Sequence, residues 1–331
     1  SLNRLNPAYQ IYYGDNDSIA ISSELNEIYV LFEKEEKGSS EQLKKFLKQA
    51  KSNYELAVTD MVYKPGISPL ELINPKSVTK LNQLFVDIRK QISKKFSNPR
   101  LIKILEFPVL FLGAKPGNTP AMYNFMNWAD FGLGTWHPKG GMFEVIKGME
   151  TLAKQLGVQF VLNAPVDKIE ISKDGIAENI LVNGKRIASD IVLSGADYYH
   201  TEQLLDSKYR QYSDAYWNKK TFAPSSLLFY VGFGKKIKNV SHHTLFFDEE
   251  FDSHAEYIYD TPSWPKDPLF YASFPSITDD AFAPEDKEAA TFLIPIAPGI
   301  EDTEEQRNKY FELIINRLEK LTNQKLKSDI L

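Results

Sequence analysis

The chain has 331 residues, of which 43% are hydrophobic and 25% are charged, and its net charge is −5. This composition is that of a globular protein long enough for two domains, and it has no basic excess that would indicate nucleic acid as a partner. The absence of cysteine excludes disulfides, thiolate nucleophiles and cysteine-ligated metal sites. No apolar window approaches the roughly 18 residues of a membrane span. We expect no signal peptide at the first residues.

Local patterns in the first third of the chain predict a β-hairpin followed by helices. Alternating apolar residues flank a turn rich in Gly, Asp and Asn, which is typical of a hairpin. Apolar residues at helical spacing follow it, and Asn98 with Pro99 has the sequence of a helix start. The predicted segments are the hairpin at residues 9–21 and helices at 39–54, 76–96 and 98–105.

The most apolar stretch outside the strands, residues 105–112, precedes a helix that we predict to start at Pro120 and to carry Phe125 and Met126. A buried helical subdomain is the simplest explanation, because apolar helical faces are usually core. The alternatives are a lining for a long apolar substrate and a surface that lies in a bilayer interface beside nearby basic residues. The 13% aromatic content suits an apolar pocket and core packing about equally.

The centre of the chain is organised around residues 134–142, and we call Trp136–Met142 within this stretch the glycine loop. It contains Gly140 and Gly141 and leads into a helix whose apolar residues, up to Leu156, recur at the spacing of a half-buried helix. Glycines before a helix let the backbone approach a ligand closely, although they equally relieve crowding in an ordinary loop.

Strand patterns follow this helix. Asn183-Gly184 favours a tight hairpin, because both positions accept positive φ. The predicted segments are a strand at 158–162, an antiparallel meander over 166–187 and a buried strand at 190–196. Strand, helix, strand, meander and strand together predict half of a nucleotide-binding α/β domain.

The C-terminal third is strand-rich again and ends in a helix. We expect its strands to pair with the N-terminal hairpin in a mostly antiparallel sheet, which would build one domain from two separated segments. Thr303 and Gln306 have capping-box spacing and predict where the last helix begins. The predicted strands are 227–233, 244–247, 269–272 and 291–296.

Several motifs occur in the order found in bacterial and fungal phytoene desaturases, the flavin-dependent carotenoid desaturases, and the chain resembles this family over nearly its whole length. These motifs include Trp136-His137-Pro138-Lys139-Gly140-Gly141-Met142, Pro120-Ala121-Met122-Tyr123, Ser194-Gly195-Ala196-Asp197 and His242-His243-Thr244. The family's Gly-x-Gly-x-x-Gly turn and its glycine-rich C-terminal flavin segment have no counterpart in this sequence. We therefore interpret the chain as an internal piece of a longer enzyme.

The resemblance implies a mixed α/β fold of the amine-oxidase-like flavoprotein type. It combines part of an FAD-binding α/β domain with a discontinuous substrate domain, which has a mostly antiparallel sheet and a helical subdomain. We expect the substrate domain at residues 1–133 (helical subdomain 76–130) and 201–302. The partial FAD-binding domain would occupy residues 134–200, and residues 303–331 would form a helix leading to a missing remainder.

By the same resemblance, the parent enzyme would use FAD to remove a hydride and a proton from C–C bonds of a long apolar polyene, as a cytoplasmic, peripherally membrane-associated protein. The chain alone would not retain FAD and would be inactive. His137 is the candidate proton acceptor. The candidate substrate-facing residues are Trp136, Met142, Phe125 and Met126. The candidate flavin-binding residues are Gly140, Gly141, Val166, Ser194, Gly195 and Ala196.

Two other functions stay open from the sequence. One is a different flavoprotein oxidase of the same superfamily, such as an amine or protoporphyrinogen oxidase, which would need charged groups for its charged substrate. The other is a non-catalytic module that binds an apolar ligand, a membrane face or a partner.

A metal site is not predicted, because His242 and His243, as neighbours on a strand, should point to opposite faces. Asp279 and Asp280 are expected to be solvated rather than catalytic. The serines lie in no Gly-x-Ser-x-Gly elbow, which leaves a hydrolase without support.

Overall fold

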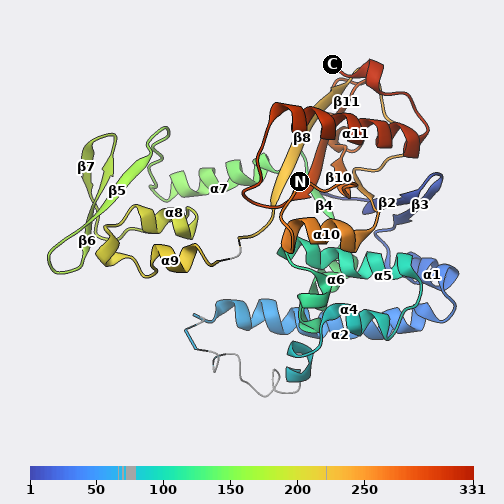
Figure 1. Cartoon of the computed structure of the whole chain (residues 1–331), viewed down its shortest axis with the longest axis horizontal. Helices are drawn as coiled ribbons and strands as arrows, with labels where there is room; N and C mark the ends of the chain where they lie inside the picture. The colour runs from blue at the N-terminus through green and yellow to red at the C-terminus, as the bar shows by residue number, and fades with distance from the viewer. Residues whose placement is uncertain (66, 69–70, 72–79, 221) are drawn as a thin grey trace. The chain divides into compact units, whose positions relative to one another are not determined.

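The computed structural model describes residues 1–65, 67–68, 71, 80–220 and 222–331. They form two compact units (Figure 1). Residues 1–145 with 223–331 make the first, which we call the sheet unit, and residues 146–222 make the second, which we call the meander unit.

A six-stranded sheet in the order β3-β2-β9-β10-β11-β8 organises the sheet unit. Among the described strands of this sheet only the β2–β9 pair is parallel, and the other neighbours are antiparallel. The N-terminal hairpin therefore joins strands more than 200 residues away, which confirms the predicted sheet from two segments. The strands are β2 (Tyr9–Gly14), β3 (Asp17–Ile21), β8 (Ser225–Phe233), β9 (His243–Phe246), β10 (Phe270–Ser273) and β11 (Glu288–Ile296).

Helices supply the rest of this unit. The predicted caps are confirmed at two of them: the Asn98 side chain accepts from the Arg100 backbone N–H, and Thr303 accepts from Gln306. The helices are α1 (Leu25–Glu35), α2 (Ser39–Thr59), α4 (Ile88–Ser93), α5 (Pro99–Glu106), α6 (Phe125–Trp128), α10 (Phe251–Tyr259) and α11 (Glu304–Thr322). Short 3-10 turns connect them, at Met61–Tyr63, Leu81–Leu84, Phe107–Leu112, Pro116–Asn118, Ala121–Asn124, Ser207–Tyr209 (in the meander unit), Pro275–Ile277 and Lys327–Asp329, and a π-helical turn spans Ala129–Leu133.

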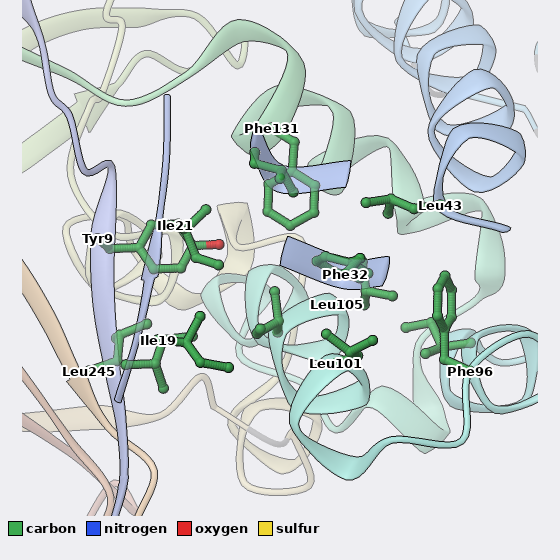
Figure 2. Close-up of a cluster of buried hydrophobic side chains, with 14 of the residues drawn as sticks. Tyr9, Ile19, Ile21, Phe32, Leu43, Phe96, Leu101, Leu105, Phe131 and Leu245 are labelled. Atoms are coloured by element: carbon green, nitrogen blue, oxygen red, sulfur yellow. The ribbon is translucent and has the colours of Figure 1, made fainter. Parts of the chain in front are cut away.

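Two hydrophobic clusters cover the two faces of the sheet. Successive residues of one strand point to opposite faces, so Leu245 belongs to one cluster and Phe246 to the other. The first cluster (Figure 2) fills the space between the sheet and α1, α2, α4 and α5, with Phe32 near its centre and Phe96 toward its edge. The second packs α11 on the other face. Burying each large apolar side chain contributes about 1.5–3 kcal/mol, so these clusters define the sheet unit.

The helix expected at residues 76–96 is wrong as a single element, and its first residues, 76–79, lie outside the described part. The chain has a 3-10 turn at Leu81–Leu84 and then bends before the extended residue Asp87, and the Val86 carbonyl accepts from the Ala121 N–H. The Asp87 side chain then caps α4 by accepting from the Lys90 N–H. The bridge to residues 119–121 explains the interruption, because a residue that bonds to a distant segment cannot continue the helix ladder.

In the meander unit, local signals are confirmed and buried strands are not. It contains most of α7 (Phe143–Gln155), then β5 (Val166–Ile171), β6 (Ala177–Val182), β7 (Lys185–Ala188), α8 (Tyr198–Gln203) and α9 (Asp214–Trp217). Asn183 and Gly184 form the predicted turn with φ of 49° and 75°, and Gly157 follows α7 with φ of 86°.

The strands predicted at 158–162 and 190–196 are wrong for this structure, because the described residues offer no neighbouring strand to pair with them. The half-buried face expected for α7 is wrong too, since none of its residues is buried.

Candidate functional site

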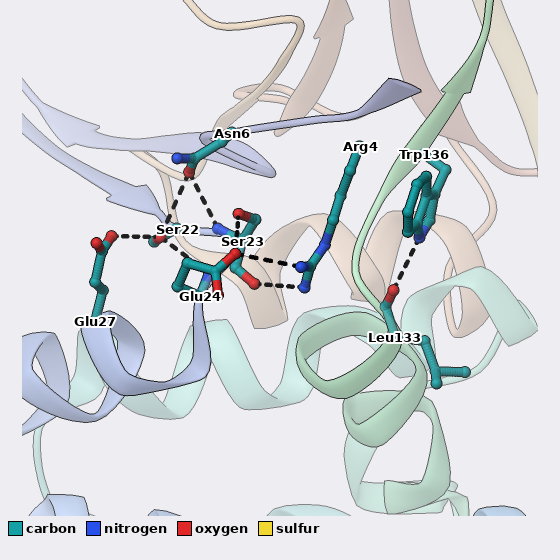
Figure 3. A network of polar contacts seen from close by, with 8 residues as sticks. All are labelled: Arg4, Asn6, Ser22, Ser23, Glu24, Glu27, Leu133 and Trp136. Atoms are coloured by element: carbon teal, nitrogen blue, oxygen red, sulfur yellow. Dashed lines mark hydrogen bonds and ion pairs between the residues drawn. The ribbon is translucent and has the colours of Figure 1, made fainter. Parts of the chain in front are cut away.

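The first strand of the chain holds the glycine loop along one side. β1 (Leu2–Arg4) pairs antiparallel with β4 (Trp136–Pro138), a pairing that the sequence analysis missed. The Arg4 guanidinium donates to the Ser23 carbonyl at 2.7 Å and lies 5.9 Å from the centre of the Trp136 ring. The Trp136 indole N–H donates to the Leu133 carbonyl at 2.8 Å (Figure 3). These contacts fix the entrance of the loop.

Two successive glycines bend the loop. Gly140 and Gly141 have φ of 85° and 96°, a region that side chains disfavour, and the Gly141 N–H donates to the Pro138 carbonyl at 2.8 Å. A Cβ atom on Gly141 would lie 2.7 Å from the Phe282 ring. At position 141 the loop therefore packs against the turn at residues 275–282 more closely than a residue with a side chain would allow.

Asp279 joins that turn to the loop. Its Oδ2 accepts from the Gly140 backbone N–H at 2.6 Å and contacts His137 Nε2 at 3.1 Å, while Oδ1 accepts from the Ala281 N–H at 3.1 Å. The residue is only 6% exposed. The hydrogen bond from Gly140 lowers the pKa of this carboxyl, so it is ionised at neutral pH. The expectation of a solvated Asp279 is wrong, because the carboxylate is enclosed between the turn and the glycine loop.

Three imidazole rings meet beside this carboxylate. The ring of His242 lies 4.6 Å from that of His137 and 4.4 Å from that of His243, centre to centre. The sequence analysis expected His242 and His243 to point to opposite faces of a strand. That expectation is wrong, because His242 lies just before β9 and not in it. Burial lowers the pKa of His242 to about 3 and of His243 to about 4, so both are neutral near pH 7. The described residues contain no group of side chains suited to a metal ion.

A partly buried acid just before the loop was also missed. Asp130 lies in the π-helical turn Ala129–Leu133, and its Oδ2 accepts from the Tyr9 hydroxyl at 2.8 Å. Burial raises the pKa of Asp130 to about 7. Such shifts, like π-helical turns, occur often at functional sites, and the partner is 121 residues away, where no sequence pattern indicates it.

The predicted site residues lie at several places. His137 is 6% exposed, whereas Trp136 and Met142 are 48% and 67% exposed, so the loop presents apolar side chains outward while it buries its imidazole. Phe125 and Met126 are partly buried in α6, where the Phe125 ring packs 5.5 Å from Tyr123.

The other predicted flavin residues belong to the meander unit. Val166 begins β5, and Ser194, Gly195 and Ala196 form the turn before α8. The Ser194 hydroxyl bonds to Thr201 at 2.7 Å, and a Cβ on Gly195 would meet nothing within 4 Å.

A cavity of about 920 Å³ in the sheet unit lies elsewhere, lined by Lys236, Lys238, Asp280, Glu285 and Glu288 among others. None of its lining residues belongs to the glycine loop. Charges of both signs around its walls do not suit a long apolar ligand, since apolar ligands are held mainly by apolar side chains.

Residues 71–237 match the model of the flavin-containing amine oxidoreductases, and this stretch covers half of the chain and includes the glycine loop. The chain belongs to the flavin-containing amine oxidoreductase family.

Its similarities to named proteins are of the phytoene desaturase type. It is 36% identical to the carotenoid 3,4-desaturase of Haloarcula japonica over 95% of this chain and 64% of the relative. It is 29% identical to the 4,4'-diapophytoene desaturase of Staphylococcus haemolyticus over 94% of this chain and 64% of that protein. For the zeta-carotene-forming phytoene desaturase of Myxococcus xanthus the identity is 28%, over 89% and 57%. The chain thus spans about three fifths of these relatives.

Solved structures show the same fold. An oxidoreductase from Methanosarcina mazei superposes with a TM-score of 0.59 at 17% identity, over 97% of this chain and 67% of its own. A protein from Pyrococcus furiosus superposes with a TM-score of 0.56 at 14% identity, over the same shares. Together with the family match, these likenesses confirm the predicted mixed α/β class.

Proposed function

We propose that this chain is the larger part of an FAD-dependent carotenoid desaturase, which removes a hydride and a proton from a C–C bond of a long apolar polyene. The observation that carries the proposal is the 36% identity, over 95% of the chain, to a protein named carotenoid 3,4-desaturase. Two further relatives are named as desaturases of phytoene-like compounds.

Each of the two units, taken by itself, contains glycines that would suit a flavin-binding loop. Gly140 and Gly141 bring backbone close to their neighbours, and Gly195 lies in an exposed turn with open space beside it. The sequence has no Gly-x-Gly-x-x-Gly turn for the pyrophosphate. Bound flavin would supply the hydride acceptor. We expect that this chain needs further polypeptide to retain it.

Exposed apolar residues of the meander unit support that expectation. Apolar residues of α7 and of segments 158–162 and 191–193 face solvent, with Leu162 and Leu193 81% and 95% exposed. Large contiguous apolar surfaces on soluble proteins usually mark an interaction site, and so many exposed large apolar side chains in one unit favour a covering partner. In the whole protein, we propose, the remaining two fifths of the relatives' length covers them and completes the flavin domain.

The glycine loop would border the substrate. Trp136 and Met142 offer apolar surface without charge, which suits a hydrocarbon that needs little polar recognition. Phe125 and Met126 would line the same path in the helical subdomain. His137 is the proposed proton acceptor, since donation from Nε2 to Asp279 leaves Nδ1 as the basic nitrogen.

The polyene is insoluble in water, so we also propose peripheral contact with a membrane surface. None of the described helices is long and apolar enough to cross a bilayer.

An absorbance spectrum of the purified chain, taken before and after incubation with excess FAD and desalting, tests the cofactor part. We expect a colourless protein, and a retained flavin band would contradict that part. An extended protein that includes the rest of the relatives' length would then be assayed with carotene-loaded liposomes. Flavin-loaded protein that oxidises an amine or protoporphyrinogen but leaves carotenes unchanged would overturn the substrate. Carotene binding without turnover would instead favour a non-catalytic module.

A further inference from the structure

Asp279 contacts the glycine loop at two points and is itself held by the turn from which it projects. Its backbone N–H donates to the Pro275 carbonyl at 3.0 Å, and its carbonyl accepts from the Phe282 N–H at 3.3 Å. The bond from the Ala281 N–H fixes the remaining carboxylate oxygen. Contacts within the turn alone therefore fix the Asp279 backbone and one carboxylate oxygen. The second oxygen is left as a preorganised acceptor for the glycine loop.

The other oxygen, Oδ2, bonds to the loop on both sides of Pro138 and Lys139. One donor is the Gly140 backbone N–H, and the other is the His137 ring nitrogen. Hydrogen bonds to a buried ionised group are stronger than neutral ones, and a glycine pair with positive φ has much conformational freedom to lose. The carboxylate oxygen thus bridges the two ends of the segment His137–Gly140. It adds to the backbone bonds from Lys139 to Ser1 and from Gly141 to Pro138, and it joins this bend to the turn at residues 275–282 through side-chain hydrogen bonds.

We propose that Asp279 is the positioning residue that holds the glycine loop in its bent conformation and thereby orients Trp136 and Met142. Trp136 directly precedes the clamped residues His137–Gly140, and Met142 follows them after Gly141. Both carboxylate oxygens of Asp279 already bond to groups of the protein, so it acts through the loop and not by touching substrate. That Trp136 and Met142 face a substrate rests on the proposed function. That Asp279 holds the bend of the glycine loop, which we call the clamp, does not.

The neighbouring residue gives a matched control. Asp280 carries the same side chain one position along the chain, but it is exposed and lines the charged cavity. Lys139, inside the clamp, is exposed and offers trypsin a cleavage site before Gly140. The rate at which the fragment beginning at Gly140 appears, measured by mass spectrometry, reports how often the loop opens.

Asp279→Asn should raise this rate about tenfold or more, while Asp280→Asn should leave it within about twofold of wild type. His137→Phe keeps the ring packing and the Gly140 bond, and should give an intermediate rate. Folded Asp279→Asn protein that is cleaved at the wild-type rate would overturn the proposal.

Should Asp279→Asn fail to fold, two other measurements decide. In the wild type, the Gly140 amide should be protected from hydrogen exchange by at least about tenfold relative to an unstructured glycine. An unprotected Gly140 amide, or an unchanged cleavage rate in His137→Phe, would each count against the clamp.

The substrate part is tested separately in the flavin-loaded extended protein. Asp279→Asn should raise the KM for carotene several-fold more than it lowers kcat, because a displaced wall weakens substrate contacts. A merely structural role would lower the amount of active protein and leave KM unchanged, which would overturn the positioning claim. Wild type without any carotene turnover would contradict the proposed function and leave the clamp standing on the proteolysis and exchange results.

Discussion

The two units contain the same kinds of apolar residue and treat them in opposite ways. In the sheet unit Phe246 is fully buried, between the stacked rings of Tyr12 and Phe270. In the meander unit the side chains of Leu162 and Leu193 are almost fully exposed to solvent. The difference lies in the neighbouring layers, since helices cover both faces of the six-stranded sheet and no comparable layer covers the apolar segments of the meander unit within the described residues. Periodicity therefore does not predict whether a layer covers an apolar segment, and the strands predicted at 158–162 and 190–196, which have no such layer, do not form.

The largest expected difference in stability comes from replacing one apolar side chain of each unit with alanine. Phe246→Ala should lower the free energy of unfolding of the sheet unit by about 3–5 kcal/mol, because it removes a fully buried ring. Leu193→Ala should change stability by less than about 0.5 kcal/mol. Urea unfolding followed by circular dichroism measures both. A large loss from Leu193→Ala would mean that this segment is covered in solution and would break the contrast.

Replacing one glycine of each unit with alanine gives a second comparison. Gly141→Ala should destabilise the chain by about 2–4 kcal/mol, because its φ is 96° and the new methyl group would meet Phe282. Gly195→Ala, with open space around it, should be nearly neutral. Thermal unfolding of the two variants makes the comparison. Equal losses would show that the meander unit constrains its turn as tightly as the sheet unit constrains the glycine loop.

A smaller effect depends on pH. Because the pKa of Asp130 is raised to about 7 from an ordinary 3.8, folding favours its neutral form. This contribution is complete below the ordinary pKa and is lost as pH rises through about 7. Asp130→Asn should therefore be more stable than wild type by about 2 kcal/mol at pH 8, and by much less at pH 5.

The measurement is urea unfolding at both pH values, with Asp167→Asn as the control, an exposed carboxyl of β5 in the meander unit. Parallel stability curves for wild type and Asp130→Asn between pH 5 and pH 8 would contradict the assignment. They would mean that the Tyr9–Asp130 pair is better hydrated than its burial indicates.

Signals that lie within a few residues could be predicted from the sequence. Asn183-Gly184, the Asn98 cap and the Thr303 cap each act on backbone one to three residues away, and each was correct. The sheet strands were found from alternation and length.

Contacts set by long-range pairing could not be predicted. No local pattern ties His137 to Asp279, 142 residues away, or Tyr9 to Asp130. The break at residues 86–87 has the same origin, because the backbone there bonds to Ala121. Family resemblance indicated that the glycine loop matters, and only the folded chain shows which carboxylate holds it.

The parallel pairing of β2 with β9 has a consequence for the order of folding. Gln10 and Ser241, whose side chains bond beside this pair, are separated by 231 residues. At roughly 5–20 residues per second, a ribosome would need about 12–46 s between making the two. During that time the N-terminal hairpin has an unpaired strand edge and no sheet to bury it. The strands of the meander unit pair with their immediate neighbours in sequence. This unit can therefore form before β9 is available to pair with the hairpin. Nascent chains of this protein should therefore depend on chaperones most in the interval before β9 emerges.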